Sequence, residues 1–392
     1  MGAAIQGLRG SGEFTADYRP KNYRELYTLL EPNGTAPLNA LLSMAQSEAT
    51  DDPEYKNFRD EMPNRVVTIN NGGGYNSSAT SLTIAAANDN KYAIAGAILV
   101  NSRTGEVVRV TADTTSTTLA VVRNIGSTAY TINQSDTFFV SGYAATENDT
   151  TPTTVSFDAD VVSNYTQIFR TAFGLSNTLK STYLRTGPKE DELTTKALKL
   201  HMSDIERAMF FGIKAEENGS SSTPRRYTGG LMTSISTTIN LASAVDSDGT
   251  MSETQFDDQL IQTVFKYGSK EKLVFGGWKA AALLQQIGKA RWQPQQVGGT
   301  YGVNITRYST FAGDLMFHLH PAFRQVPGMD GTMIFLDVPN LKYRYLQGRD
   351  TNLYENRQGN NQDGVIHEYM TECGLELLQD KVHTVIKGWT GL

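Results

Sequence analysis

The clearest pattern of apolar and polar positions lies over residues 188–217 and predicts a long amphipathic helix. Its apolar residues recur at spacings of four, three and four, which places them on one helical face: Leu198, Met202, Ile205 and Met209. Pro188 and the acidic residues at 190–192 suit the start of this helix, because proline fits a first turn and carboxylates stabilise the positive end of the helix dipole. About 26 helical residues would form a rod of roughly 39 Å.

Short strand-like stretches between residues 80 and 142 predict a small β-sandwich or barrel. They are rich in β-branched and aromatic residues, are separated by turn-forming residues, and cover 80–86, 96–101, 105–111, 116–123 and 136–142. The residues from Asn101 to Gly105 predict a hairpin turn. Further strands are expected at 64–70 and 157–175, on either side of this β-module. We therefore expect the module, at about 76–146, to be inserted into a larger unit.

The remaining chain alternates helical and strand-like patterns, so the predicted class is α+β. Helices are expected at 254–267 and 278–287, and strands at 272–275, 303–310, 314–320, 332–337 and beyond 341. A long polar loop is expected at 348–364. Residues 1–62 are weakly patterned apart from a short helix over 37–45, and they predict an extended arm.

Charge and composition narrow the functional classes. The chain has 392 residues, with 35 basic and 41 acidic side chains and a net charge of −6, which argues against a dedicated nucleic-acid binder. Its one cysteine, Cys373, excludes an intrachain disulfide framework. The longest apolar run, 93–100, falls far short of the roughly 20 residues of a membrane span, and no signal peptide is evident. We expect a soluble protein, intracellular at synthesis and without a membrane partner.

The chemical motifs of common enzymes and cofactor sites are missing. The sequence has no phosphate-binding G-x-x-x-x-G-K-[ST] loop and no G-x-S-x-G nucleophile motif. His367-Glu368 begins like a zinc-protease motif, but Thr371 stands where the second histidine is required. We therefore expect no enzyme activity, no catalytic residue and no cofactor.

Weaker candidates for chemistry have simpler structural explanations. His318 and His320 share a strand face and, with Asp314, could bind a metal, but paired strand histidines explain them as well. Cys373 could be a nucleophile with His383 as its base, although a single cysteine is more often a buried apolar residue. The acidic groups at 51–54 and 190–192 could bind cations, or be a solvated arm and a helix start. We expect no metal site.

A small basic excess marks the first 24 residues. Arg9, Arg19, Lys21 and Arg24 stand against Glu13 and Asp17, a net charge of +2. Such a group could contact nucleic acid weakly, and a solvated arm explains it equally well.

The order of the predicted parts resembles the major capsid protein of tailed bacteriophages with the Hong Kong 97-type fold. An arm is followed by a long hairpin with an inserted β-module, a long helix and a mixed α/β region. Four segments also resemble the SU-ten-like major head proteins, in the same order: NYTQIF (164–169), DIERAMFFG (204–212), GRDTNLYENRQGNNQDG (348–364) and ECGLELLQDKVHTVIKG (372–388). The short segment 35–42 is similar too, whereas 76–146 is less so.

The resemblance implies a domain organisation. Residues 1–62 would be the N-terminal arm, and 63–187 the extended E-loop region with the β-module at about 76–146. Residues 188–220 would be the spine helix of the peripheral domain, and 221–392 the axial domain with the remaining peripheral strands.

The resemblance also implies function, partners and location. The chain would self-assemble into hexamers and pentamers of a shell that encloses double-stranded DNA through weak, non-specific contacts. Portal, scaffolding and decoration proteins would be its partners. It would be made and assembled in the bacterial host cytoplasm and become part of the virion.

Charged residues of the long loop and the arm are the candidate contacts between subunits. These are Arg349, Asp350, Arg357, Arg19 and Lys21; a solvated loop is the alternative explanation for the first three. Two other functions remain open. An encapsulin-type compartment shares the fold but encloses an enzyme, and a β-rich tail or adhesin protein would bind surface glycans through its Thr-rich module.

Overall fold

The computed structural model describes most of the chain as two compact units. The described residues are 38, 47–61, 65–85, 91–113, 116–147, 150–156, 158–182, 189–219, 222–241, 249–288, 295–300, 303–324 and 326–391. One unit is Phe58–Val161, called here the barrel unit; the other, the main unit, combines Met1–Asn57 with Val162–Leu392. Apart from Leu38, the helix predicted over 37–45 lies outside the described residues, as do the basic arm residues from Arg9 to Arg24.

The barrel unit consists of six strands that close on themselves. They are β3 (Val66–Thr68), β4 (Ser81–Thr83), β5 (Ala97–Asn101), β6 (Val107–Val110), β7 (Thr118–Val122) and β8 (Thr137–Tyr143). Their order is β3-β8-β5-β6-β7-β4, and an antiparallel bridge between Ile69 and Ile84 joins the two end strands. The predicted sandwich or barrel is thus a barrel, and it also contains β3, which the sequence suggested as a flanking strand.

Alternation along each strand fills the interior of this barrel. The apolar residues that point inward include Leu99, Val108, Val110, Leu119 and Phe138, each at most 1% exposed. The turn predicted between β5 and β6 is present, and Gly105 has a φ of +71°, a conformation that favours glycine.

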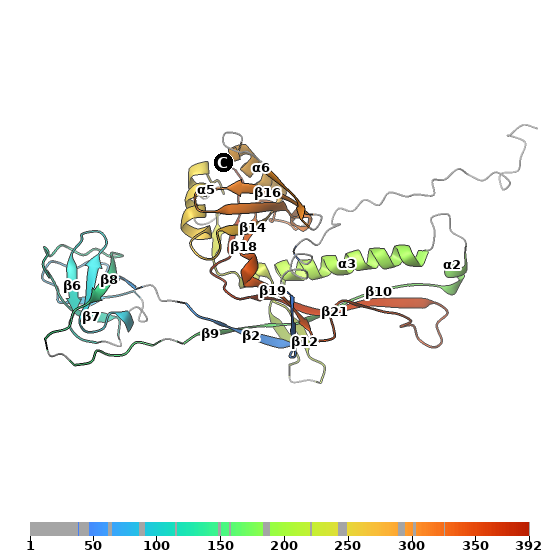
Figure 1. Ribbon diagram of the computed structural model, residues 1–392, viewed down its shortest axis with the longest axis horizontal. Coiled ribbons are helices and arrows are strands. Elements are labelled where there is room, and N and C mark those ends of the chain that lie inside the picture. Colours follow the sequence, from blue (N-terminus) through green and yellow to red (C-terminus); the bar gives the residue numbers. More distant parts are fainter. Residues whose placement is uncertain are drawn as a thin grey trace, which may run out of the picture. The chain divides into compact units, whose positions relative to one another are not determined.

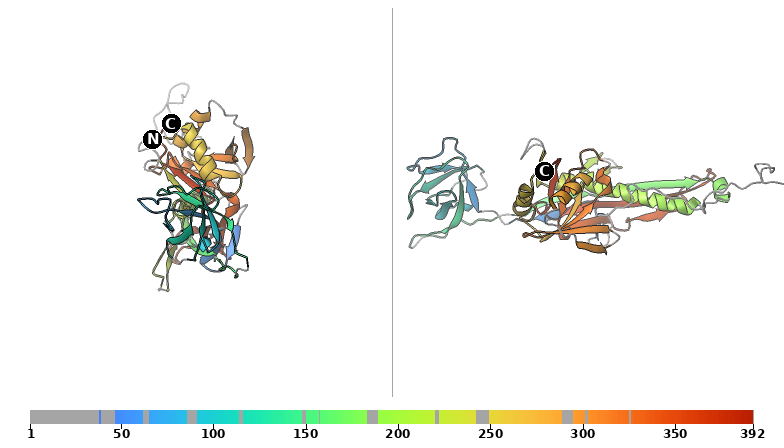
Figure 2. Two further views of the ribbon diagram at one scale, coloured as in Figure 1. Left: turned by 90° about the vertical axis from the view of Figure 1, so that its left-hand side faces the viewer. Right: turned by 90° about the horizontal axis from the view of Figure 1, so that it is seen from above.

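The first sheet of the main unit brings together distant parts of the chain. It contains β1 (Ser47–Thr50), β19 (Leu341–Leu346), β21 (Val365–Leu377) and β10 (Gln167–Leu175) in that order, with β20 (Asn352–Tyr354) also pairing with β21. The helix α3 (Lys189–Phe211) runs along β10 and β21, as Figures 1 and 2 show.

The second sheet lies between two apolar clusters. Its order is β13 (Thr238–Asn240), β22 (Thr384–Lys387), β18 (Met333–Leu336), β14 (Glu271–Gly276), β17 (Asp314–Leu319), β16 (Val303–Ser309) and β15 (Gln295–Thr300). Val274 of β14 packs with α5 (Glu253–Gln259), a π-helical turn (Leu260–Val264) and α6 (Trp278–Gly288), whereas Leu273 and Phe275 pack with α3. Burial on both faces explains the continuous apolar run of β14.

Smaller elements complete the main unit and the connections. The pairs of strands are β2 (Glu54–Arg59) with β9 (Asp160–Tyr165) and β11 (Ala215–Glu217) with β12 (Arg225–Tyr227). Short helical turns occur at α2 (Asn177–Ser181), α4 (Leu231–Ser234), Pro321–Arg324 and Val338–Asn340. Within the described part of the chain, no helix is both long and apolar enough for a membrane span.

The long helix predicted over 188–217 is present but ends at Phe211. Residues 215–217 instead pair with 225–227 as a β-hairpin, so their backbone groups bond across strands. Of the predicted apolar face, Ile205 and Met209 are buried and Met202 is partly buried. The predicted helix over 254–267 is likewise shorter, because its second half is the π-helical turn.

Candidate assembly surface on strand β21

Strand β21 has a different chemistry on each of its two faces. Because successive residues of a strand point to opposite faces, residues four apart share a face. Glu368, Glu372 and Glu376 therefore line one face, and they are only 5%, 5% and 2% exposed. Carboxylates buried to this extent require charged or hydrogen-bonding partners. We call these three residues the carboxylate ladder.

The first member of the ladder, Glu368, holds two arginines from different segments. Arg170 of β10 donates to both carboxylate oxygens, with an Nη2–Oε2 distance of 2.9 Å. Arg357 from the long loop lies 3.5 Å from Oε2. The hydrogen bond from Arg170 is the main reason why the pKa of Glu368 lies below its usual range. Glu368 thus ties the long loop to a strand that precedes it by almost 200 residues.

The second member, Glu372, binds the start of the same loop. Its carboxylate oxygen lies 2.6 Å from Nε of Arg349, and its backbone N–H donates to the carbonyl of Arg349 at 2.9 Å. The hydroxyl of Thr166 donates to its other oxygen at 3.2 Å. The loop at 348–364 is therefore attached to β21 near its start, by Arg349, and in its middle, by Arg357.

The third member, Glu376, connects the ladder to the N-terminal segment. Nε of Arg344 on β19 lies 2.5 Å from Glu376, and Nη1 of the same arginine lies 2.7 Å from Glu48 on β1. Lys342 also binds Glu48, at 2.6 Å. The hydrogen bond from Lys342 is the largest cause of the lowered pKa of Glu48. These contacts hold β1 in parallel register beside β19.

The loop residues singled out from the sequence have partners inside the subunit. Arg349 binds Glu372, Arg357 binds Glu368 and also lies over the ring of Tyr354, and Asp350 accepts a hydrogen bond of 2.9 Å from the hydroxyl of Tyr343. The structure therefore brings the two arginines onto neighbouring members of the ladder. Arg19 and Lys21 lie outside the described residues.

The ladder itself and its partners Arg170 and Arg344 were missed from the sequence. One signal could have found the glutamates: they stand four residues apart in HEYMTECGLEL, so they share a face of any strand formed there. Their arginine partners lie on other strands, and no local pattern identifies them.

The opposite face of β21 packs under α3, and the side chains described there form neutral contacts. His201 of α3 lies between the hydroxyls of Thr171 and Thr371, at 3.0 Å and 2.7 Å. Burial raises the pKa of the Cys373 thiol to about 12, so the thiol is protonated at neutral pH. Cys373 lies beside Tyr343, whereas His383 accepts a hydrogen bond from the backbone of Asp337. This geometry does not support a Cys373–His383 nucleophile pair.

Each of the candidate metal ligands has another contact within the subunit. His320 lies 2.9 Å from Glu206 of α3, whereas His318 packs edge-on against Phe275 and Asp314 binds Arg307. Across the described ranges, no three His, Cys, Asp or Glu side chains gather in a way that could hold a metal ion.

Glu190 and Glu192 at the start of α3 are paired as well. Glu190 binds Lys180 at 2.9 Å and His367 at 3.1 Å, and Glu192 binds Lys189 at 2.6 Å.

Glu206 also anchors part of the N-terminal region. Leu38 is 1% exposed within the core beneath α3, and its backbone N–H donates to Glu206 at 2.9 Å. Together with β1, this contact ties two points of the segment before residue 51 to the main unit.

The comparison with known families decides the identity. A model of the family named SU10 major capsid protein matches residues 10–390. The chain belongs to the SU10 major capsid protein family. As a phage major capsid protein, it is a structural component of the virion and forms the head shell by association with copies of itself.

Individual relatives of this capsid protein are distant. A major capsid protein of Pseudomonas phage PaMx41 is 26% identical over 387 residues, covering 91% of this chain and 89% of that protein. Among solved structures, the capsid of a native GTA particle has 9% identity, a TM-score of 0.48 and 94% coverage of both chains. Mycobacterium phage Adephagia gives 10% identity, a TM-score of 0.46 and 95% coverage of both chains.

The fold of this capsid protein agrees with the predicted class. It is α+β, with the long helix, the extended strands and the inserted barrel in the predicted order. Family membership does not favour the encapsulin-type compartment or the tail or adhesin protein.

Proposed function

We propose that this capsid protein forms hexamers and pentamers by covering the large apolar side chains that the single subunit leaves exposed. Within its described residues, the main unit exposes seven such side chains by 48% or more: Ile168, Leu200, Ile213, Ile261, Trp278, Phe311 and Leu319. In a shell, neighbouring subunits would cover these side chains, and the burial of large apolar groups stabilises protein–protein contacts. This exposure is the observation that carries the proposal.

The carboxylate ladder has a positioning role in this proposal. Arg349 and Arg357 keep about 39% and 46% of their side-chain surface exposed although each binds a buried glutamate. The ladder therefore holds the loop at 348–364 in one shape, with Arg349, Asp350 and Arg357 presented to a neighbouring subunit. Arg19 and Lys21 of the arm would contact neighbours as well.

The regions of the chain would take the roles of a Hong Kong 97-type subunit. Residues 1–62 would be the arm, 63–187 the E-loop region with its inserted module, 188–220 the spine helix and 221–392 mainly the axial domain. We propose that the barrel unit faces the outside of the shell. A map of the shell with the barrel in the lumen would contradict that orientation.

The proposed partners follow from the role as a shell. Portal, scaffolding and decoration proteins would associate with the assembled subunits, and assembly would take place in the bacterial host cytoplasm. The net charge of −6 favours weak, non-specific contact with the enclosed double-stranded DNA, because strong retention needs many cationic contacts to phosphates. The subunit would have no enzymatic activity.

Electron microscopy of the overexpressed full chain, with and without neighbouring head genes, tests the proposal. We expect closed shells, sheets or capsomer rings from the native sequence. Arg349→Glu would place two carboxylates side by side at Glu372, so we expect fewer shells while the subunit stays soluble. The matched control is Arg225→Glu, because Arg225 pairs with Glu217 at 3.7 Å but both are exposed on the β11–β12 hairpin.

Two results would contradict this picture at different levels. Shell yields that are equal for Arg349→Glu and the native chain would remove the role of the loop. A monodisperse monomer or trimer in every condition would remove the proposal of hexamers and pentamers itself.

A further inference from the structure

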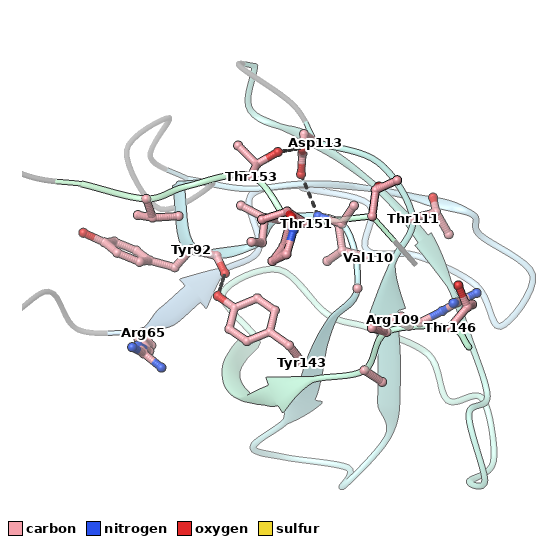
Figure 3. Close-up of a pocket in the computed structure, with 18 residues that line it drawn as sticks. Arg65, Tyr92, Arg109, Val110, Thr111, Asp113, Tyr143, Thr146, Thr151 and Thr153 are labelled. Carbon is pink, nitrogen blue, oxygen red and sulfur yellow. Dashed lines mark hydrogen bonds between the residues drawn. The ribbon is translucent and has the colours of Figure 1, made fainter. Parts of the chain in front are cut away.

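One mouth of the barrel unit contains a pocket of about 720 Å³. Its wall is formed where β5 begins, β6 ends and β8 ends, and the Thr-rich stretch at 150–155 runs across it (Figure 3). Pockets for small ligands have volumes of about 300–1,000 Å³ and often lie in the mouths of β-barrels. The assembly of the shell, as described above, does not involve this pocket.

The pocket has two arginines without an acidic partner among the described residues. Nε of Arg109 is buried and has no hydrogen-bond partner in the described structure. Arg65 is exposed at the rim of the pocket, and in Figure 3 it lies at the left whereas Arg109 lies at the right. A buried guanidinium N–H without a partner costs free energy, which a bound anion would recover. The arginines therefore indicate a ligand with a negative charge.

The acidic residue of the pocket restricts where that charge can lie. Asp113 accepts hydrogen bonds from the backbone N–H of Ala95 at 2.6 Å and from the hydroxyl of Thr153. These bonds, first of all that from Thr153, hold the pKa of Asp113 below its usual range, so it stays ionised. An anion is repelled from this end of the pocket, while a ligand hydroxyl can still donate to the carboxylate.

The rest of the lining suits a body rich in hydroxyl groups. Tyr92 and Tyr143 border the pocket, and the hydroxyl of Tyr143 donates to the carbonyl of Tyr92 at 2.8 Å, which orients its ring. Thr111 and Thr151 add further hydroxyls to the wall. Such a wall offers ring surfaces for packing and neutral groups that both donate and accept hydrogen bonds.

We propose that this pocket binds an acidic saccharide, with sugar carboxylates at Arg109 and at Arg65 and sugar hydroxyls at Asp113 and the threonines. Asp113 distinguishes this ligand from an acidic peptide, because its carboxylate accepts hydrogen bonds from sugar hydroxyls but repels the carboxylates of a peptide. The site belongs to the barrel unit of the shell subunit.

Titration calorimetry of the full-length protein tests the site, with trigalacturonate as the acidic probe and maltotriose as the neutral one. We expect trigalacturonate to bind and maltotriose not to bind. Arg109→Gln and Arg65→Gln are each expected to weaken binding by about tenfold or more, since each removes a charge-assisted hydrogen bond. Lys91→Gln is the matched control, because Lys91 is exposed beside Tyr92 but does not line the pocket.

Several outcomes would overturn the proposal. They are the absence of trigalacturonate binding, an equal loss of affinity in the Lys91 variant, and tighter binding of hexaglutamate than of trigalacturonate. If Arg109→Gln fails to fold, as judged by circular dichroism, the exposed Arg65→Gln variant decides the question by itself.

Discussion

The barrel unit and the first sheet of the main unit are both β-structures, but they are stabilised in different ways. The barrel is built from strands within one continuous stretch of chain, and its interior consists mainly of aliphatic and aromatic side chains. The first sheet joins β1, β10, β19 and β21 from distant parts of the sequence, and one face of its central strand carries three buried carboxylates. A local stretch can specify the first arrangement, whereas the second depends on partners supplied by long-range folding.

The largest expected effect concerns the apolar interior of the barrel. Phe138 is fully buried, and Phe138→Ala is expected to lower the free energy of unfolding of the barrel by about 3–5 kcal/mol, because it removes packing and leaves a cavity. The neighbouring Phe139 is 44% exposed, so Phe139→Ala is the matched control and should cost much less. Denaturant unfolding, with hydrogen exchange as the probe of the barrel, would measure the free energy of unfolding of both variants. Equal losses in the two variants would contradict the assigned interior.

A smaller effect is expected from the charges of the first sheet. Glu376→Ala leaves Arg344 without its buried partner, and we expect the free energy of unfolding to fall by about 2–3 kcal/mol. The loss is smaller than for an arginine left with no partner, because Glu48 still binds Arg344. Glu48→Ala removes the exposed partner of the same arginine and should cost at most about 1 kcal/mol. Equal losses of stability for the two variants in denaturant titrations would show that burial does not determine how much each ion pair of Arg344 contributes.

The smallest effects are in pH dependence, and they should differ between the two units. In the main unit, burial and then Lys272 lower the pKa of His383 from 6.5 to about 4, despite nearby Asp337 and Asp380. The unfolded chain binds this proton at a higher pH than the folded unit does. Stability from the neutral imidazole is therefore present above about pH 6.5 and is lost as the pH falls towards 4.

In the barrel unit, the corresponding loss should occur at lower pH. The hydrogen bond from Arg103 is the main cause that lowers the pKa of Asp136 from 3.8 to about 2. The stability from this carboxylate is present above about pH 3.8 and is lost as the pH falls towards 2. Thermal unfolding should be measured at a series of pH values. We expect His383→Gln to reduce the loss of stability between about pH 6.5 and 4, and Asp136→Asn to reduce the loss between about pH 3.8 and 2. Identical profiles for both variants would contradict these assignments.

The extent to which the sequence predicted the structure differs between the same two regions. The five strands expected between residues 80 and 142 are all present, because alternation and turn residues act within a few positions. The long helix was predicted from its apolar spacing, yet its end was placed too late, because the hairpin partner of residues 215–217 lies ten residues further on. Arg349 and Arg357 were selected from a polar loop, but their partners Glu372 and Glu368 were not.

The sequence by itself determined the α+β class, most of the elements and, through its resemblance to a known family, the role as a capsid protein. Only the tertiary structure decided that β3 completes a closed barrel, that Leu38 is held by Glu206, and that the long loop is attached to a buried carboxylate ladder. The physical reason is the range of the interactions. Periodicity and turn preferences depend on neighbouring residues, whereas a buried charge is stable only beside a partner that the fold brings from elsewhere in the chain.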